Sequence, residues 1–264
     1  MELGIIGLAK SGKTTIFNAL SRGHAETAAF GRTSLEPLVA VVKVPDERLE
    51  RLAVLVKAKK ITHAEVRYLD IGSTSERFGK GEGIAGPLLN ALGRCDELIH
   101  VVRAFADPSL PHPHGSVDPD RDIATMDMEL AYTDASLVER RIERLVESMK
   151  SASGSDREAR AAEAEWLKEL KSALEAGTPV REQNLAAAQQ QALVSMALLT
   201  AKPLLVILNI GEEQLAALAI RRPRLVFPVP RGPHNRYAWA SLSSATAFRK
   251  VCVIGSCPAT SEKA

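Results

Sequence analysis

Aromatic residues and cysteines are scarce in this chain, and long apolar runs are missing. Phe, Trp and Tyr make up 4% of its 264 residues, and its three cysteines lie at uneven spacings. An odd number of scattered cysteines predicts no disulfide framework. No apolar run reaches the length of a membrane span, and the first residues do not have the pattern of a signal peptide. We therefore expect a cytoplasmic protein with no membrane partner.

Charge of one sign is not in excess either. The 34 Lys and Arg residues and the 32 Asp and Glu residues leave a net charge of +2, which is too small to imply DNA as a partner. The apolar share of 45% and the charged share of 25% are ordinary for a globular protein. A chain of this length has enough material for one large domain or for two modest ones.

The most informative stretch is residues 3–20, LGIIGLAKSGKTTIFNAL. Within it, Gly7 to Thr14 fits the pattern G-x-x-x-x-G-K-[ST], with a short apolar strand before it and an amphipathic helix after it. Gly7 and Gly12 permit backbone turns that bring consecutive N–H groups onto phosphate oxygens, and the helix adds its positive dipole end. Lys13 places an ammonium on the β- and γ-phosphate oxygens, and the Thr14 hydroxyl can ligate Mg²⁺. A chance match is the alternative, but the strand–loop–helix context makes it rare.

Apolar runs typical of buried strands recur along the chain between helical patterns. They lie at residues 3–6, 39–44, 65–70, 98–103 and 204–208. Strands separated by helices predict an α/β fold with a mostly parallel sheet, in which ligands bind at the carboxyl ends of the strands. Together with the phosphate-loop pattern, this predicts the fold of a P-loop NTPase.

The alternation stops between residues 121 and 200, where no convincing strand is found. Two long helical patterns, separated near Gly154, predict an inserted α-helical coiled-coil hairpin with about six turns per arm. We therefore expect a first part of the nucleotide-binding domain at 1–120, the helical insertion at 121–200, and the fifth strand with the end of that domain at 201–218. The charges of the hairpin are most simply a solvated face, and a partner-docking arm is the alternative.

Several polar residues lie in or after the expected strands. Asp70 closes an apolar strand downstream of the phosphate loop, which is the usual place of the carboxylate that holds Mg²⁺ through water. His100 lies within a strand and is predicted to be a packed core residue. His112 and His114 lie in a Pro-containing loop, where a lone histidine is most often solvated. Cys95 stands between charges of opposite sign that offset each other, which favours an unreactive cysteine.

Taken in order, these segments resemble the YchF-type, or Obg-like, ATPases of the P-loop GTPase class. The segments that carry the resemblance are GIIGLAKSGKTTIFNAL, SLEPLVAVVKVPDERLERLA, VRYLDIG to GKGEGIAG, HVVRAF, HGSVDPDRDI, MELAYTDASLVERRIERL and LTAKPLLVILNIGEE. They occur in the family's order up to about residue 218, and a helical insertion between the fourth and fifth strands is itself a family trait. The resemblance implies an ATP hydrolase of the GTPase-type fold that uses Mg²⁺ and associates with the ribosome.

The resemblance also implies a role for each residue of the expected site. It assigns the phosphate loop to Lys10, Ser11, Gly12, Lys13, Thr14 and Thr15. It assigns Mg²⁺ binding to Thr14, Ser34 and Asp70, catalysis to Lys13 and His112, and base reading to Asn209, Ile210 and Glu212. The base-reading motif is N-x-x-E in place of the N-K-x-D of GTPases.

Glu212 bears on the choice between ATP and GTP. Guanine offers two parallel N–H donors that an aspartate accepts bidentately, and the longer glutamate disturbs that geometry. We therefore expect ATP to be preferred over GTP, with the positive case for ATP resting on the resemblance. A GTP-preferring switch and a non-hydrolysing nucleotide-binding adaptor are the alternatives.

The sequence departs from the family pattern at two places. The D-x-A-G switch reads DIGS at residues 70–73, so Ser73 stands where a glycine N–H usually meets the γ-phosphate, and no catalytic glutamine follows it. From about residue 219 the chain is rich in Arg and Pro and no longer resembles the family. We expect 219–264 to be a poorly ordered tail from an altered or truncated reading frame, which leaves the outer edge of the fifth strand uncovered. A basic RNA-binding arm is the alternative.

Overall fold

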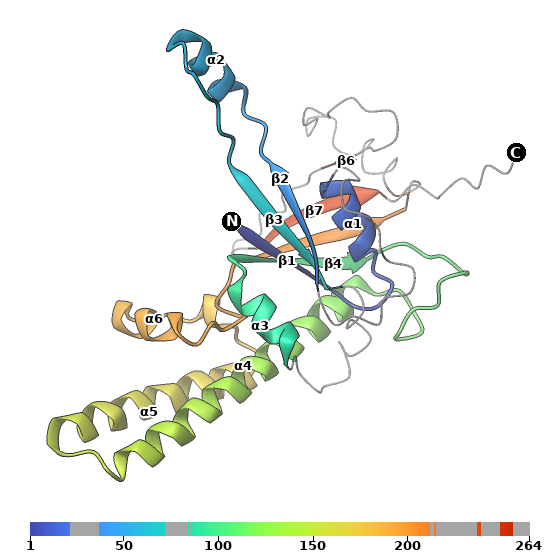
Figure 1. The fold of residues 1–264 in the computed structure, drawn as a ribbon. Helices are drawn as coiled ribbons and strands as arrows, with labels where there is room; N and C mark the ends of the chain where they lie inside the picture. The colour runs from blue at the N-terminus through green and yellow to red at the C-terminus, as the bar shows by residue number, and fades with distance from the viewer. Residues whose placement is uncertain are drawn as a thin grey trace, which may run out of the picture.

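A seven-stranded sheet runs through the protein in the order β2-β3-β1-β4-β5-β7-β6 (Figure 1). The computed structural model describes residues 1–21, 37–71, 84, 86–211, 214, 237–238 and 249–255, the last two ranges by their backbone alone. The strands are β1 (Glu2–Ile6), β2 (Leu38–Lys43), β3 (Glu65–Asp70), β4 (Glu97–Arg103), β5 (Leu204–Ile210), β6 (Tyr237–Ala238) and β7 (Arg249–Gly255). The helices are α1 (Lys13–Leu20), α2 (Glu47–Leu55), α3 (Pro87–Arg94), α4 (Pro119–Met149), α5 (Gly154–Glu175), the 3₁₀ turn η2 (Val180–Glu182) and α6 (Ala187–Val194).

The sheet is parallel through its centre. β1 pairs with β3 and β4, β4 pairs with β5, and β5 pairs with β7, all in parallel. The two edge strands, β2 and β6, are antiparallel to their neighbours. The predicted α/β fold with a mostly parallel sheet is therefore confirmed, and its first five strands lie within two residues of their predicted positions.

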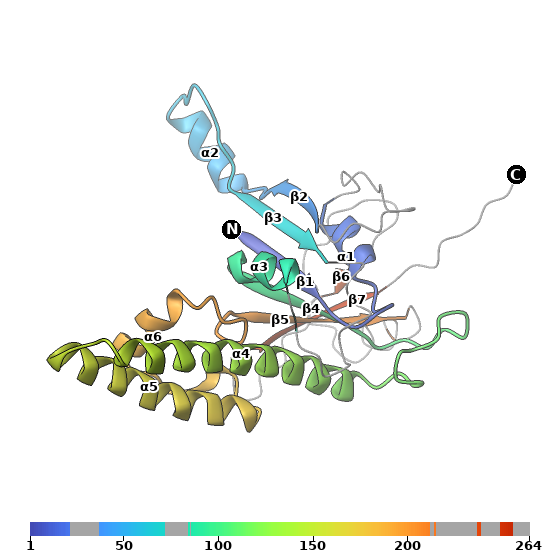
Figure 2. The same cartoon turned by 60° about the horizontal axis from the view of Figure 1, so that its bottom comes forward.

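Helices cover both faces of the sheet because successive residues of a strand point to opposite sides. Ile5 of β1 packs with Phe17 of α1 on one face. The next residue, Ile6, packs with Leu92 of α3 and Met126 of α4 on the other face. Figure 2 shows α3 and α4 on the side of the sheet that faces away from α1. The continuous apolar runs of β1, β4 and β5 are those of strands buried on both faces.

α4 takes part in two different cores. Near its start, Met126 and Leu130 pack against the sheet. Further along, Val138 and Leu145 pack against Leu167 of α5, and the two helices run back along each other as an arm that projects from the sheet (Figures 1 and 2). α5 has 22 residues, which matches the predicted six turns. α4 has 31 residues and is longer than predicted, because its first half belongs to the sheet layer.

A buried carboxylate fastens the arm to the chain that enters β5. Asp134 of α4 has no exposed surface. Its Oδ1 accepts a hydrogen bond from the N–H of Leu199 at 2.9 Å, and its Oδ2 accepts hydrogen bonds from the N–H and the hydroxyl of Thr200 at 2.7 and 2.6 Å. Burial raises the pKa of Asp134, and these hydrogen bonds oppose that rise. The arm is therefore attached to the segment that precedes the fifth strand, through a carboxylate whose two oxygens both accept hydrogen bonds.

The extension made by β2, α2 and β3 carries exposed apolar residues. The leucines at 49, 52 and 55 have helical spacing, and Asp46 caps α2 by accepting a hydrogen bond from the N–H of Arg48. No residue of α2 is buried, however, and Leu52 and Leu55 are 55% and 79% exposed. A periodic pattern therefore predicts that a helix forms, but it does not predict which surface the apolar face of that helix packs against.

The expectation of an uncovered fifth strand is wrong. β7 pairs with β5 in parallel along its whole length, from Leu204 opposite Arg249 to Ile210 opposite Gly255. The tail that no longer resembles the family therefore supplies the sixth and seventh strands of the sheet. Most other residues of 219–264 lie outside the described residues. The expectation that this tail is poorly ordered therefore falls on residues that the structure does not describe. No described helix combines the length and the apolarity that crossing a bilayer requires.

Candidate nucleotide-binding site

The loop between β1 and α1 has a backbone that requires glycine at two positions. Gly7 has a φ of 147° and Gly12 a φ of 96°, a region that L-residues with side chains rarely adopt. A Cβ on Gly7 would run into the carbonyl oxygen of Val101, and a Cβ on Gly12 would run into the side-chain amide of Asn209. The two glycines of the predicted motif are therefore fixed by both conformation and space, and the loop is held against β4 and β5.

Lys13 lies across this loop. It is 5% exposed, and its ammonium donates hydrogen bonds to the carbonyl oxygens of Gly7 at 3.0 Å and Leu8 at 2.8 Å. Burial lowers the pKa of Lys13 from its ordinary 10.5 to about 8, while the charge of Asp70 acts in the opposite direction. An anion placed beside this ammonium would offset the cost of burying its charge, so the site is built to favour phosphate oxygens.

Thr14 and Asp70 meet as the strand order predicts. The Thr14 hydroxyl donates a 2.8 Å hydrogen bond to Oδ2 of Asp70. Asp70 is 1% exposed, and its Oδ1 has no hydrogen-bond partner. Burial raises the pKa of this carboxyl, against the hydrogen bond from Thr14 and the charge of Lys13. A hydroxyl and an unsatisfied buried carboxylate oxygen beside a phosphate loop fit Mg²⁺, which binds few protein oxygens and takes its other ligands from phosphate and water.

Asn209 joins the predicted base-reading motif to the phosphate loop. It lies inside β5 rather than after it, and its Nδ2 donates a 3.0 Å hydrogen bond to the carbonyl oxygen of Ser11. Both residues are 2% exposed, and Oδ1 of Asn209 and Oγ of Ser11 are buried with no hydrogen-bond partner. Ile210 is also buried. The structure therefore brings Asn209 to the loop, while Glu212, Ser34 and Ser73 lie outside the described residues.

The comparison with protein families agrees with this geometry. Residues 2–140, more than half of the chain, match the family model of the 50S ribosome-binding GTPases. The chain belongs to this family.

Curated relatives of this chain include three proteins named ribosome-binding ATPase YchF. Those of Bacillus subtilis and Haemophilus influenzae are 38% and 36% identical over 216 and 212 residues, which is 82% and 80% of this chain and 58% and 57% of theirs. That of Escherichia coli O157:H7 is 33% identical over 237 residues, 86% of this chain and 64% of its own. The solved Schizosaccharomyces pombe YchF GTPase has a TM-score of 0.66 and 27% identity, over 85% of this chain and 61% of its own.

The resemblance to YchF-type proteins is thus confirmed. The chain spans about three fifths of the length of the curated relatives that it matches.

His112 is not the solvated histidine that its loop predicts. Its side chain is 4% exposed, and its Nε2 lies 2.9 Å from Oδ2 of Asp122 in the first turns of α4. His114, two residues further, is exposed. The loop leaves the carboxyl end of β4, where Arg103 donates hydrogen bonds to the carbonyl oxygens of Phe105, Asp107 and Leu110. The sequence did not predict a role for Asp122 or for Arg103. The signal that could have identified Arg103 is its place at the end of an apolar strand.

The structure also places four other residues that the sequence analysis singled out. Lys10 is exposed and has a φ of 60°, and Thr15 is the third residue of α1, with an exposed side chain. His100 is fully buried in β4, as predicted. Cys95 is 1% exposed, and burial raises its pKa to about 11, which agrees with an unreactive thiol.

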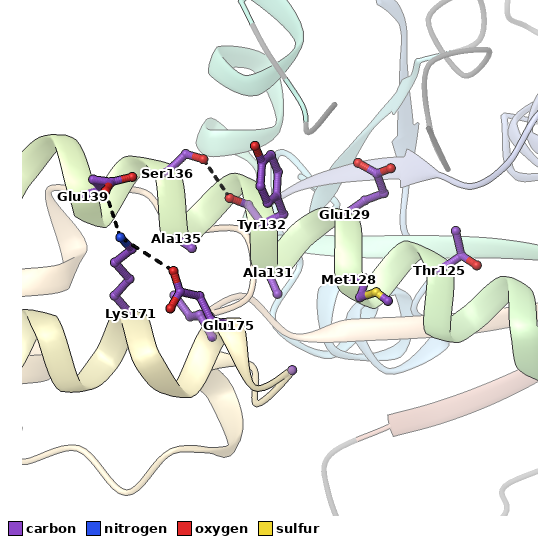
Figure 3. A pocket seen from close by; sticks show the side chains of 12 residues that line it. Thr125, Met128, Glu129, Ala131, Tyr132, Ala135, Ser136, Glu139, Lys171 and Glu175 are labelled. Atoms are coloured by element: carbon purple, nitrogen blue, oxygen red, sulfur yellow. Dashed lines mark hydrogen bonds and ion pairs between the residues drawn. The ribbon is translucent and has the colours of Figure 1, made fainter. Parts of the chain in front are cut away.

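A groove of about 580 Å³ lies on the arm, between α4 and the end of α5 (Figure 3). Its lining combines apolar residues with three glutamates and one lysine. The lining residues are Thr125, Met128, Glu129, Ala131, Tyr132, Ala135, Ser136, Glu139, Lys171, Leu174, Glu175 and Gly177. Lys171 pairs with Glu139 at 2.8 Å and with Glu175 at 3.6 Å. The groove therefore carries more acidic than basic side chains.

Proposed function

We propose that this protein binds ATP with Mg²⁺ at the loop before α1 and hydrolyses it in association with the ribosome. The observation that carries the proposal is the assembly of Lys13, Thr14 and Asp70 around a backbone that only glycine permits. The relatives support ATP and the ribosome, because those aligned above are named ribosome-binding ATPases.

In this proposal the chain's own groups bind and orient the triphosphate. The backbone N–H groups from Gly7 to Thr14 and the start of α1 point at phosphate oxygens. The ammonium of Lys13 exchanges two loop carbonyls for the β- and γ-phosphate oxygens. Thr14, Asp70 and Ser34 would hold Mg²⁺, which when bound neutralises developing charge on the phosphates.

Hydrolysis requires a group that orients the attacking water. The sequence has no glutamine after the DIGS segment at 70–73, and we propose that His112 takes this role. The support is its place in the family pattern and its position in the loop that leaves β4 beside β1, whose end begins the phosphate loop. Lys13 is the second catalytic group, since it contacts the transferred phosphoryl group.

Base choice is assigned to Asn209 and Glu212. Asn209 lies against the phosphate loop, and Glu212 follows three residues later with a carboxylate one methylene too long for the paired donors of guanine. This favours ATP over GTP. Titration with equal series of labelled ATP and GTP, with and without Mg²⁺, tests the base choice and the metal together. A higher affinity for GTP would establish the GTP-preferring switch instead.

A non-hydrolysing adaptor is the second candidate, and Ser73 favours it because a side chain replaces the glycine at the γ-phosphate. Single-turnover release of phosphate from bound ATP separates the two functions. Release faster than spontaneous hydrolysis supports the enzyme, and nucleotide that stays intact through the incubation supports the adaptor. Co-sedimentation with purified 70S ribosomes, in ATP and in ADP, tests the ribosomal partner.

A further inference from the structure

His112 and Asp122 form a buried pair between the β4–α4 loop and α4. The two side chains are 4% and 3% exposed, and Nε2 of His112 lies 2.9 Å from Oδ2 of Asp122. A contact of this length between a ring nitrogen and a carboxylate is a charge-assisted hydrogen bond, which is stronger than one between neutral groups. The imidazole is therefore held from one side by α4.

The carboxylate of Asp122 is itself fixed in place. Its Oδ1 accepts hydrogen bonds from Nε and Nη2 of Arg121 at 3.2 and 3.0 Å. The same guanidinium donates to the hydroxyl of Ser116 at 3.0 Å and to the carbonyl oxygen of Ser116 at 2.6 Å. Arg121 therefore connects the carboxylate to the loop that carries His112, and the pair has little freedom to reorient.

The two nitrogens of the His112 ring differ in their partners. Nδ1 accepts a hydrogen bond from the N–H of His114, so it carries no proton, and Nε2 carries the proton that faces Asp122. The contact to His114 is 3.2 Å long, it joins residues two apart in a loop, and its donor residue His114 is itself exposed. Water can replace such a donor at little cost, whereas turning Nε2 away from Asp122 would leave the buried Oδ2 of that carboxylate without its histidine donor.

We propose that Asp122 is the positioning residue for His112 in hydrolysis. It holds the ring in the tautomer with the proton on Nε2, so that Nδ1 is the nitrogen that accepts a hydrogen bond from the attacking water. The arrangement has the logic of a catalytic histidine whose far nitrogen is oriented by a carboxylate. This inference rests on the proposed role of His112.

In the step that His112 assists, the water oxygen forms a bond to the γ-phosphorus. The bond from the γ-phosphorus to the bridging oxygen breaks, and ADP leaves with that electron pair. The proton that water loses passes to the phosphate product and then to solvent. His112 and Asp122 are unchanged at the end.

The tautomer can be observed without any substitution. In the full chain labelled with ¹⁵N-histidine, His112 is assigned by comparison with His112→Gln. We expect Nδ1 to give the signal of an unprotonated nitrogen and Nε2 that of a protonated one. In Asp122→Asn we expect a mixture of both tautomers. A wild-type His112 that is protonated at Nδ1, or that already exchanges between tautomers, overturns the proposal.

Single-turnover hydrolysis of ATP separates positioning from a merely structural role. Asp122→Asn keeps an oxygen for Arg121, and we expect it to slow hydrolysis by about tenfold or more while ATP affinity stays unchanged. Asp120→Asn removes an exposed carboxylate from the same turn of α4 and is the matched control, expected at the wild-type rate. In a His112→Ala background, Asp122→Asn should cause no further loss, because both residues act through one group.

The outcomes distinguish this inference from the proposed function. A slow His112→Ala variant together with an Asp122→Asn variant at or above the wild-type rate overturns the role of Asp122 alone. A hydrolysis rate above that of the wild type would mean that the contact with Asp122 prevents His112 from assisting hydrolysis. A His112→Ala variant at the wild-type rate overturns the proposed role of His112, and the inference with it.

Discussion

Asn209 donates a hydrogen bond from its Nδ2 to the carbonyl oxygen of Ser11, 198 positions earlier in the chain. The contact is buried, and it crosses from the end of β5 to the middle of the phosphate loop. An amide assigned to base reading therefore also supports the loop that we propose binds phosphate. The two parts of the proposed nucleotide site are coupled through one side chain.

Asn209→Ala is expected to weaken phosphate binding as well as base binding. The substitution leaves the carbonyl of Ser11 buried without a donor, which should lower the free energy of unfolding by about 1–3 kcal/mol. It should also lower affinity for inorganic tripolyphosphate, which has no base, as measured by competition with a fluorescent nucleotide. Asn90→Ala, at an exposed site on α3, is the control. Unchanged tripolyphosphate affinity would confine Asn209 to reading the base.

Because Lys13 is buried, we expect its contribution to the free energy of unfolding to rise at alkaline pH. Its pKa is about 8 in the folded protein against 10.5 ordinarily. Between these values an unfolded chain holds the Lys13 proton that the folded one has lost, so the contribution of Lys13 to the free energy of unfolding increases with pH across that window. This contribution should approach about 3 kcal/mol. The buried Cys95, whose pKa is raised from 9.0 to about 11, acts in the opposite direction above pH 9, so the contribution of Lys13 is measured as the difference between wild type and Lys13→Met in urea unfolding from pH 7 to 11.

Lys13→Met should remove this component of the pH dependence. Lys10→Met, at an exposed position of the same loop, should retain it. If the wild type and Lys13→Met give parallel pH profiles, Lys13 is not buried as a charged group.

Asp70→Asn is expected to weaken the effect of Mg²⁺ on nucleotide binding. Burial already raises the pKa of this carboxyl, so the neutral amide should fold without loss of stability. The Mg²⁺ concentration needed for tight ADP binding should rise by about tenfold or more, in a Mg²⁺ titration followed by nucleotide fluorescence. Asp156→Asn, exposed on α5, should match the wild type. An unaltered Mg²⁺ requirement would remove Asp70 from the metal site.

Glu212→Asp should shift the preference towards GTP. The shorter carboxylate can approach the two N–H donors of guanine, and the ratio of ATP to GTP affinity should fall by about fivefold or more. Paired titrations with the two nucleotides measure the ratio. A ratio that does not move means that Glu212 is not the base reader.

The phosphate loop and its neighbour Asp70 could be predicted because their positions follow from local pattern and strand order. Glycine spacing fixes the loop. An acid that ends an adjacent parallel strand must then lie at the same edge of the sheet, as the contact between Thr14 and Asp70 shows. No tertiary information beyond the strand pattern was needed for either residue.

The pair of His112 and Asp122 could not be predicted in the same way. The loop has no periodicity, and nothing in the pattern of α4 distinguishes Asp122 from the neighbouring acids that stay exposed. Their contact depends on how the loop folds back on the helix, which Arg121 and Ser116 decide.

β7 lies in the tail that the Arg- and Pro-rich composition predicts to be poorly ordered. Its run KVCVIG at 250–255 is apolar but has no alternating pattern. A parallel strand inside a sheet is buried on both faces, so it reads as a continuous apolar run. The same criterion that identifies β4 and β5 therefore applies to β7, which pairs with β5.

The binding of ATP by Lys13→Ala tests the central claim most directly. In the presence of Mg²⁺, isothermal titration should show ATP binding by the wild type and by Lys59→Ala, an exposed lysine outside the site. Lys13→Ala should bind about a hundredfold more weakly, with a melting temperature no lower than that of the wild type. Equal ATP affinities for Lys13→Ala and the wild type would contradict the assignment of the nucleotide site.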